Sequence, residues 1–321
     1  MSAVAQHAPG GAPDRMDFLS LGVCGLIWGT TWLVLKFQLG AVSPVASILY
    51  RFLLSGLLMF PISALQGRRL HLSRQEHMLA ASQGVSVFCC GYLLVYMAEG
   101  HAPSAVVAVA FALMALVNTA MFRLVLGQKA HRGAWIGAGL GAMGVASLSY
   151  GQIAHSPARN DLLIGVGLTV LSVIANACGN LATRISQRSG APVATMTGWS
   201  MLYGCAALMV IGLVTRVSFA VPMTWIWWGS FLYLTLVGSV AAFLIYYSLA
   251  NRRGFTLASY TSVLTPPIAM VVSSLFEKVR WDWTALLGLI FIIVGQVLIV
   301  RQGRLAPVPS AGKMGAGSGP H

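Results

Sequence analysis

The residues best suited to bind a solute form one stripe on an otherwise apolar segment. Trp28, Trp32 and Lys36 are spaced four residues apart, so on an α-helix they share one face. A shift of 148 residues leads to a second stripe, of two amides and a cation: Asn176, Asn180 and Arg184. We interpret the two stripes as facing walls of a solute cavity. The alternative is that they are faces on which helices pack against each other.

The composition is that of a membrane protein. The chain has 321 residues, of which 57% are apolar and only 8% are charged, and its mean hydropathy is +0.78. Soluble domains carry about 25% charged residues. The net charge of +13 comes mostly from lysines and arginines that flank apolar segments in ones and twos. Because no basic stripe with interleaved aromatic residues lies in a polar region, we expect no nucleic-acid partner.

The spacing of the apolar runs predicts an all-α integral membrane fold with ten transmembrane helices, since a helix needs about 20 residues to cross the bilayer. These segments are residues 18–39, 44–65, 79–99, 103–126, 133–151, 162–186, 192–215, 225–249, 255–276 and 283–301. Thirteen lysines and arginines then lie in the segments on the side of the termini, and four lie on the opposite side. The positive-inside rule therefore predicts that both termini are cytoplasmic. We expect a multi-pass protein of the bacterial inner membrane.

The shift of 148 residues also relates the segments that follow each stripe. Pro44-Val45-Ala46 recurs as Pro192-Val193-Ala194, and near the end of each half two glycines seven residues apart recur at a shift of 151. Because each half has five spans, an odd number, the second half would enter the membrane from the opposite face. We therefore predict two inverted five-helix repeats, an arrangement used for alternating access. The expected organisation is a disordered leader (1–17), the first repeat (18–151), a linker (152–160), the second repeat (161–301) and a disordered tail (302–321).

Several short motifs resemble one transporter family. The first half contains Ile27–Trp32 (IWGTTW) and Ser43–Phe52 (SPVASILYRF), and the second contains Leu264–Pro267 (LTPP). In this order they resemble the EamA type of the drug/metabolite transporter superfamily, over about residues 18–301. The resemblance implies two five-helix halves and the export or exchange of a small organic solute, such as an amino acid or a related metabolite.

Arg51 is the most informative single residue, because it lies seven positions into an apolar span. A cation inside a membrane costs roughly 2.5–3.5 kcal/mol at the span centre, and such a residue is a site candidate. Its guanidinium would hold a carboxylate or phosphate of the solute. Alternatively, Arg51 pairs with Glu99 for structural reasons. Glu99, near the outer mouth, is also the candidate that would take up a proton for coupling.

Further residues could line the solute path. Asn118 is an amide inside an apolar span and needs hydrogen-bond partners, from neighbouring helices or from a solute. The remaining candidates for solute binding are aromatic: Tyr92, Tyr96, Trp199, Tyr247 and Tyr260. Pro266 and Pro267 are expected to break the ninth helix and to form either a gate hinge or a tolerated kink.

The pattern favours a secondary transporter for a small-molecule solute, with protons as a candidate coupling ion. No phosphate-binding loop is present, and no cofactor or metal is expected, since the five cysteines lack ligand spacing. An intramembrane enzyme is disfavoured because none of the seven acidic residues lies deep within a span. A channel or a non-transporting subunit is the other alternative, although no filter or charged ring is evident. The oligomeric state does not follow from the sequence.

Overall fold

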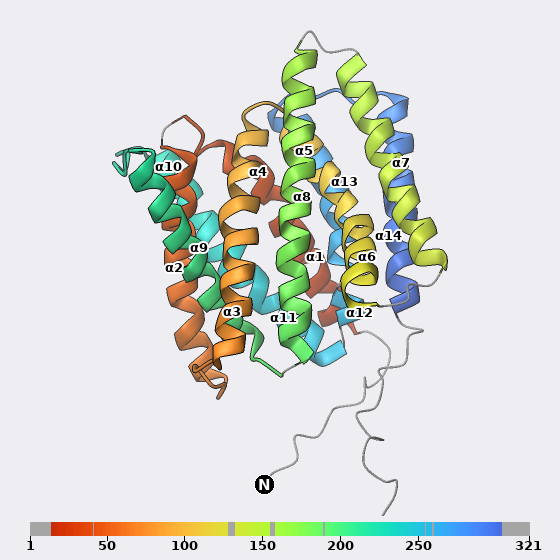
Figure 1. The fold of residues 1–321 in the computed structure, drawn as a ribbon. Helices are drawn as coiled ribbons and strands as arrows, with labels where there is room; N and C mark the ends of the chain where they lie inside the picture. The colour runs from red at the N-terminus through yellow and green to blue at the C-terminus, as the bar shows by residue number, and fades with distance from the viewer. Residues whose placement is uncertain are drawn as a thin grey trace, which may run out of the picture.

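The computed structural model describes residues 14–303 except 41, 128–131, 155–157, 189, 254 and 259, and these described residues form helices and no strand. The helices stand side by side in one bundle (Figure 1). The helical segments of the first half are α1 (Arg15–Lys36), α2 (Pro44–Leu65), α3 (Arg74–Gln83), the π-helix η1 (Gly84–Gly91), α4 (Tyr92–Glu99), α5 (Ser104–Ala110), the 3₁₀ turn η2 (Phe111–Leu113), α6 (Met114–Leu126) and α7 (Arg132–Ala154).

The second half repeats much of this series. Its segments are α8 (Arg159–Arg188), α9 (Val193–Val214), α10 (Trp225–Leu232), the π-helix η3 (Tyr233–Ala241), α11 (Ala242–Arg253), α12 (Phe255–Ala258), α13 (Thr261–Phe276) and α14 (Trp283–Gly303). Each half therefore contains one helix that is interrupted by a π segment, between α3 and α4 and between α10 and α11.

Seven of the described helical segments are long and apolar enough to cross a membrane. They are Arg15–Lys36, Pro44–Leu65, Arg74–Glu99, Ser104–Leu126, Arg159–Ser186, Val193–Val214 and Trp225–Tyr246. Two shorter apolar helices follow, Thr261–Phe276 and Trp283–Ile299. The chain is thus a multi-pass membrane protein.

Local signals in the sequence explain where several helices begin and end. Asp14 and Asp17 form a capping box, so α1 starts at Arg15, three residues before the expected start. Ser73 and Glu76 do the same for α3. Gly127 ends α6 in the left-handed conformation, with φ of 63°. The leader was expected to be disordered over residues 1–17, but Arg15, Met16 and Asp17 already belong to α1. Residues 1–13 lie outside the described part of the chain.

The two prolines of α13 do not break the helix, which corrects the expectation from the sequence. Thr261–Phe276 is continuous, with Pro266 and Pro267 inside it. The prolines lack amide protons, so they cannot donate to the carbonyls four residues earlier, at Ser262 and Val263. The disruption is limited to missing hydrogen bonds within a continuous helix.

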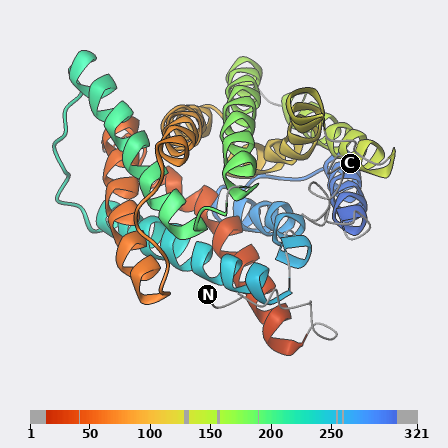
Figure 2. The same cartoon turned by 60° about the horizontal axis from the view of Figure 1, so that its bottom comes forward.

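Two pairs of helices join the halves through close contacts of small residues. A Cβ atom at Gly137 of α7 would lie 2.5 Å from the Gly295 carbonyl oxygen of α14, and a Cβ atom at Gly144 would collide with Gly288. Glycines at these positions let the backbones approach closely, as is common between transmembrane helices. The order of the contacts shows that α7 and α14 are antiparallel, and the two helices lie together at one edge of the bundle (Figures 1 and 2).

At the opposite edge, α2 packs on α9 (Figure 1). The Cys205 thiol donates to the Leu49 carbonyl at 3.5 Å, and the Ser63 and Thr195 hydroxyl oxygens are 2.6 Å apart. Residue numbers rise along α2 as they fall along α9, so these helices are antiparallel as well.

Candidate functional site

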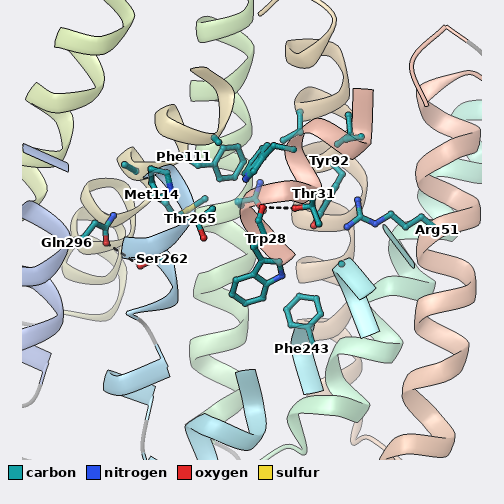
Figure 3. Close-up of a pocket in the computed structure, with 18 residues that line it drawn as sticks. Trp28, Thr31, Arg51, Tyr92, Phe111, Met114, Phe243, Ser262, Thr265 and Gln296 are labelled. Atoms are coloured by element: carbon teal, nitrogen blue, oxygen red, sulfur yellow. Dashed lines mark hydrogen bonds between the residues drawn. The ribbon is translucent and has the colours of Figure 1, made fainter. Parts of the chain in front are cut away.

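A cavity of about 320 Å³ lies inside the bundle, lined by helices of both halves (Figure 3). Its wall is mostly apolar and aromatic. The lining residues are Trp28, Thr31, Trp32, Leu35, Arg51, Tyr92, Val95, Ala108, Phe111, Ala112, Met114, Asn176, Gly238, Phe243, Ser262, Thr265, Pro266 and Gln296. This volume is at the lower end of the range for small-molecule sites.

α1 supplies the aromatic face that the sequence predicts. The Trp28 ring lies 5.9 Å from the ring of Phe243 and 5.5 Å from that of Tyr246, between ring centroids. The Trp32 ring lies 4.9 Å from that of Phe111. Such rings form a rigid apolar wall on which a flat or aliphatic group can pack. Trp28 and Trp32 thus contribute both to helix packing and to the cavity wall.

Arg51 reaches from α2 toward the cavity (Figure 3) and is only 3% exposed. Its Nε donates to the Ser239 hydroxyl at 3.2 Å, and its Cζ lies 5.1 Å from the ring centroid of Tyr92. Arg51 Cζ also lies 5.1 Å from the ring centroid of Phe52. Aromatic faces stabilise a cation electrostatically. The guanidinium is therefore held in place by a hydroxyl and two rings.

No carboxylate among the described residues forms an ion pair with Arg51. The structural alternative, an Arg51–Glu99 pair, is therefore not the arrangement observed. Guanidinium has five N–H donors, of which one binds Ser239 and another interacts with the Tyr96 hydroxyl. The remaining positive charge is available to a negatively charged group placed in the cavity.

The π segment η3 explains why Ser239 meets Arg51. The Ser239 hydroxyl donates to the Leu234 carbonyl at 3.0 Å, five residues earlier, which is the spacing of a π turn. The adjacent Gly238 leaves room, since a Cβ atom there would lie 2.7 Å from Thr31 Cγ2 and 3.9 Å from an Arg51 nitrogen. α1, α2 and η3 converge at this glycine.

Asn176 of α8 also lines the cavity. Its Nδ2 donates to the Ser172 carbonyl at 2.8 Å, and the Ser172 hydroxyl donates to the Gly91 carbonyl at 2.8 Å. Gly91 ends η1, and any larger side chain there would collide with Asn176. The first π segment thus positions Asn176 as the second positions Ser239.

Asn118 and Asn180 do not line the cavity in this conformation. The Asn180 Nδ2 donates to the Asn118 side-chain Oδ1 at 3.3 Å, which joins α8 to α6. It also contacts the Met114 sulfur at 3.5 Å. The pair matches the helix-linking alternative for amides inside apolar spans.

Lys36, Tyr96 and Glu99 lie beyond the cavity, toward one end of the bundle. Tyr96 is buried and donates to Gln38 Oε1 at 2.7 Å. Lys36 pairs with Glu277, with 2.6 Å between Nζ and Oε1. This pair joins the end of α1 to the residue that follows α13.

Glu277 is an extensively bonded carboxylate. It accepts a hydrogen bond from the Ser104 amide at 3.2 Å, and from the hydroxyls of Ser104 and Ser273. Burial raises the pKa of the Glu277 carboxyl, whereas the hydrogen bonds from Lys36, Ser104 and Ser273 lower it, and the net shift is downward. Glu277 is therefore held ionised where α1, α5 and α13 meet.

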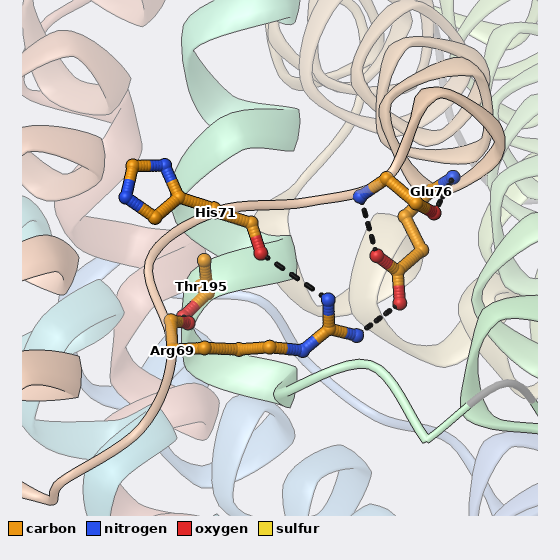
Figure 4. Close-up of polar contacts among 5 residues, drawn as sticks. Arg69, His71, Glu76 and Thr195 are labelled. Atoms are coloured by element: carbon orange, nitrogen blue, oxygen red, sulfur yellow. Dashed lines mark hydrogen bonds and ion pairs between the residues drawn. The ribbon is translucent and has the colours of Figure 1, made fainter.

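Trp199 belongs to a different part of the molecule. Its Nε1 donates to the Leu70 carbonyl at 3.3 Å, and its ring packs on His77. The loop that carries Leu70 is held by an Arg69–Glu76 ion pair and by a bond from the Thr195 hydroxyl to the Arg69 carbonyl at 2.8 Å (Figure 4). Trp199 fixes this loop on α9 and does not line the cavity.

The last predicted residues belong to α11 and α13. Tyr260 packs with Leu21 and Leu257 outside the cavity. The Tyr247 side chain lies outside the described part of the chain. Pro266 lines the cavity, whereas Pro267 does not.

Several lining residues were not predicted from the sequence. Gln296 carried a usable signal, because it is an amide inside an apolar span, as Asn118 is. The Ser262 hydroxyl donates to its Oε1 at 3.4 Å. Phe111 and Phe243 carried no such signal, since phenylalanine is common in apolar helices, and neither did Ser239, which does not line the cavity but binds Arg51.

Comparisons with known proteins agree with this architecture. The model of the EamA-like transporter family matches residues 17–150 and again residues 163–301. The chain is 27% identical over 299 residues to the uncharacterized inner membrane transporter YedA of Escherichia coli K12, covering 88% of this chain and 92% of YedA. It is 24% identical over 290 residues to the protein PecM of Dickeya dadantii, covering 88% of this chain and 91% of PecM. One solved crystal structure shares the fold, with a TM-score of 0.61 and 15% identity, over 90% of this chain and 98% of that one. This chain belongs to the EamA-like transporter family.

Proposed function

We propose that this chain is a secondary transporter that moves a small organic solute bearing a carboxylate, such as an amino acid or a related metabolite, by alternating access through the central cavity. The single observation that carries the proposal is Arg51, a buried cation that faces an aromatic cavity and has no carboxylate partner among the described residues. A carboxylate can bind a guanidinium with two hydrogen bonds.

The rest of the cavity favours a solute with an apolar portion. Trp28, Trp32 and Phe243 offer aromatic surface, and Asn176, Thr265 and Gln296 offer single polar contacts. Wide apolar walls with a few polar groups are typical of small-molecule sites. The solute's carboxylate would lie at Arg51, with its apolar portion against the rings of α1.

The two halves are proposed to be inverted repeats, and the ten-helix count belongs to the same proposal. α2 corresponds to α9 and α7 to α14 in the repeat, and each of these pairs is antiparallel. The glycines support a two-fold relation. Gly137 corresponds to Gly288 and Gly144 to Gly295, while Gly137 packs on Gly295 and Gly144 packs on Gly288. The two separate matches of the family model support it as well.

Rocking of one half against the other would expose the cavity to each side in turn. The distribution of lysines and arginines favours cytoplasmic termini. Flux of this kind saturates with solute concentration, whereas a channel would give flux that does not.

The test is uptake into proteoliposomes. A labelled amino acid or related carboxylate that shows saturable uptake is retested against its neutral amide analogue, with wild-type protein and with Arg51→Gln. We expect the wild type to prefer the carboxylate by about tenfold or more, since a hydrogen bond to a charged group contributes about 1.5–3 kcal/mol. We expect Arg51→Gln to lose that preference. Equal uptake of both analogues by the wild type contradicts the carboxylate proposal, and flux that does not saturate supports a channel.

A further inference from the structure

Glu99 is a buried acid that the cavity does not use. It is the last residue of α4 and is 2% exposed, and neither of its oxygens accepts a hydrogen bond from the described residues. Burying a carboxylate without donors is costly, so this environment favours the neutral acid. Val95, one helical turn earlier, lines the cavity. Glu99 therefore lies just beyond the cavity wall.

Two charged groups act electrostatically on Glu99, Lys36 of α1 and Glu277 at the end of α13. α1 is in contact with α4, which carries Glu99. The ammonium of Lys36 is bound to Glu277 at 2.6 Å and not to Glu99.

The other ionisable groups around α4 are engaged elsewhere. Tyr96, on α4 itself, donates to Gln38. Arg51, on α2, is held by Ser239 and Tyr92. Beyond the end of α4, His101 lies 3.4 Å from Asp161 of α8, in a pair that is exposed.

We propose that Glu99 is a proton-binding site that controls the ion pair between Lys36 and Glu277. When Glu99 is protonated, Lys36 stays on Glu277 and ties α1, in the first half, to α13, in the second. When the O–H bond of Glu99 breaks, the proton goes to water and the new carboxylate competes for Lys36. The ion pair between the halves is then replaced by one within the first half, between α1 and α4.

This exchange would affect the cavity directly. α1 carries Trp28 and Trp32, α13 carries Thr265 and Pro266, and the two helices are in contact through Gly25 and Gly29. Release of the ion pair would let their ends separate on the side of Lys36. The inference rests on the proposed transport function and names the proton as its coupling ion.

Infrared difference spectroscopy tests the protonation of Glu99 without any solute. The wild type in lipid films should show the C=O stretch of a protonated carboxylic acid that disappears as pH rises, and Glu99→Gln should lack it. Glu277→Gln frees Lys36 for Glu99, so the midpoint should fall, by roughly 1–3 pH units for a close opposite charge. Lys36→Gln should raise the midpoint. Asp161→Asn, at the same end of the molecule but exposed, should change nothing.

A distance measurement tests the exchange itself. Phe37 and Phe276 are exposed neighbours of Lys36 and Glu277, and spin labels on cysteines there report the separation of α1 and α13. The exposed native cysteines, Cys90 and Cys178, are replaced by alanine. We expect the separation to increase with pH in the wild type and to stay short at every pH in Glu99→Gln.

The proposal is overturned if the acid band persists in Glu99→Gln, if its midpoint is the same in Glu277→Gln and the wild type, or if the label separation does not follow the band. The Glu277→Gln result keeps the test decisive should Glu99→Gln fold poorly. Because no measurement uses a solute, absence of flux would contradict the transport proposal and leave the assignment of the proton site standing.

Discussion

Trp28 of α1 and Asn176 of α8 line the same cavity, although 148 residues separate them in the chain. They occupy corresponding positions in the proposed repeat, yet one is aromatic and the other an amide. The cavity therefore offers both apolar and hydrogen-bonding surface. A solute that has two chemically different ends would bind in one orientation.

The aromatic wall predicts that Trp28→Ala weakens solute binding. Loss of the indole removes contact with Phe243 and Tyr246 and leaves the apolar part of the solute partly unpacked, so KM should rise about tenfold, or ~1.4 kcal/mol. Concentration-dependent uptake measures this. Trp225→Ala is the control, because that indole is 92% exposed. An unchanged KM in Trp28→Ala would mean that the indole does not contact the solute.

Ser239→Ala should weaken binding without abolishing it. The hydroxyl that accepts from Arg51 Nε is lost, so the guanidinium is less well positioned, and a hydrogen bond to a charged group contributes about 1.5–3 kcal/mol. KM for the carboxylate should rise tenfold or more, with little effect on the amide analogue. Ser248→Ala, at an exposed position of α11, serves as the control. Equal losses for both analogues would indicate a general packing defect.

The glycine contacts between α7 and α14 predict a position-dependent effect of alanine. Gly144→Ala places a methyl group against the Gly288 backbone and should destabilise the protein by about 1–3 kcal/mol. Gly139→Ala, on the same helix with open space around it, should be neutral or stabilising by up to ~1 kcal/mol. Thermal unfolding in detergent compares the two. Equal melting temperatures would mean that α7 and α14 are not packed this closely.

The Asn118–Asn180 hydrogen bond predicts a coupling in stability. Asn118→Leu and Asn180→Leu should each destabilise the bundle, and the double variant should recover about 0.6 kcal/mol, the average for such bonds in a membrane. A double-mutant cycle from thermal unfolding measures this. Uptake assays of the same variants decide their role: an unchanged KM supports helix linkage, and a raised KM assigns the pair to the solute path.

The sequence predicts the helices well because their signal is local. A long apolar run bounded by glycine, proline or charge needs no distant information, so the expected boundary of α2 coincides with the observed one. Helical periodicity places Trp28 and Trp32 on one face of α1, and both line the cavity, whereas Lys36 at the end of that stripe does not. On α8 the same reasoning holds for Asn176 and fails for Asn180. The inward position of Arg51 follows from the cost of a cation in lipid.

What the sequence does not predict depends on distant partners. Lys36 and Glu277 are 241 residues apart, and nothing local indicates that they pair. Tyr92 and Tyr96 share one helical face, yet only Tyr92 lines the cavity, because Gln38 binds the hydroxyl of Tyr96. The continuity of α13 through Pro266 and Pro267 was likewise not predicted, since proline rules describe single helices and not helices supported by neighbours.

The π segment η3 makes the cavity sensitive to the number of residues as well as to their kinds. A π turn holds one residue more than the α-helix on either side of it, so deletion of a single residue from Tyr233–Ala241 would restore regular winding and remove the widened turn that carries Ser239. The hydroxyl that binds Arg51 would then be displaced, while α11 with Phe243 would keep its orientation. A relative one residue shorter in this segment would present a differently shaped chamber while keeping nearly the same composition, and would be expected to select a different solute.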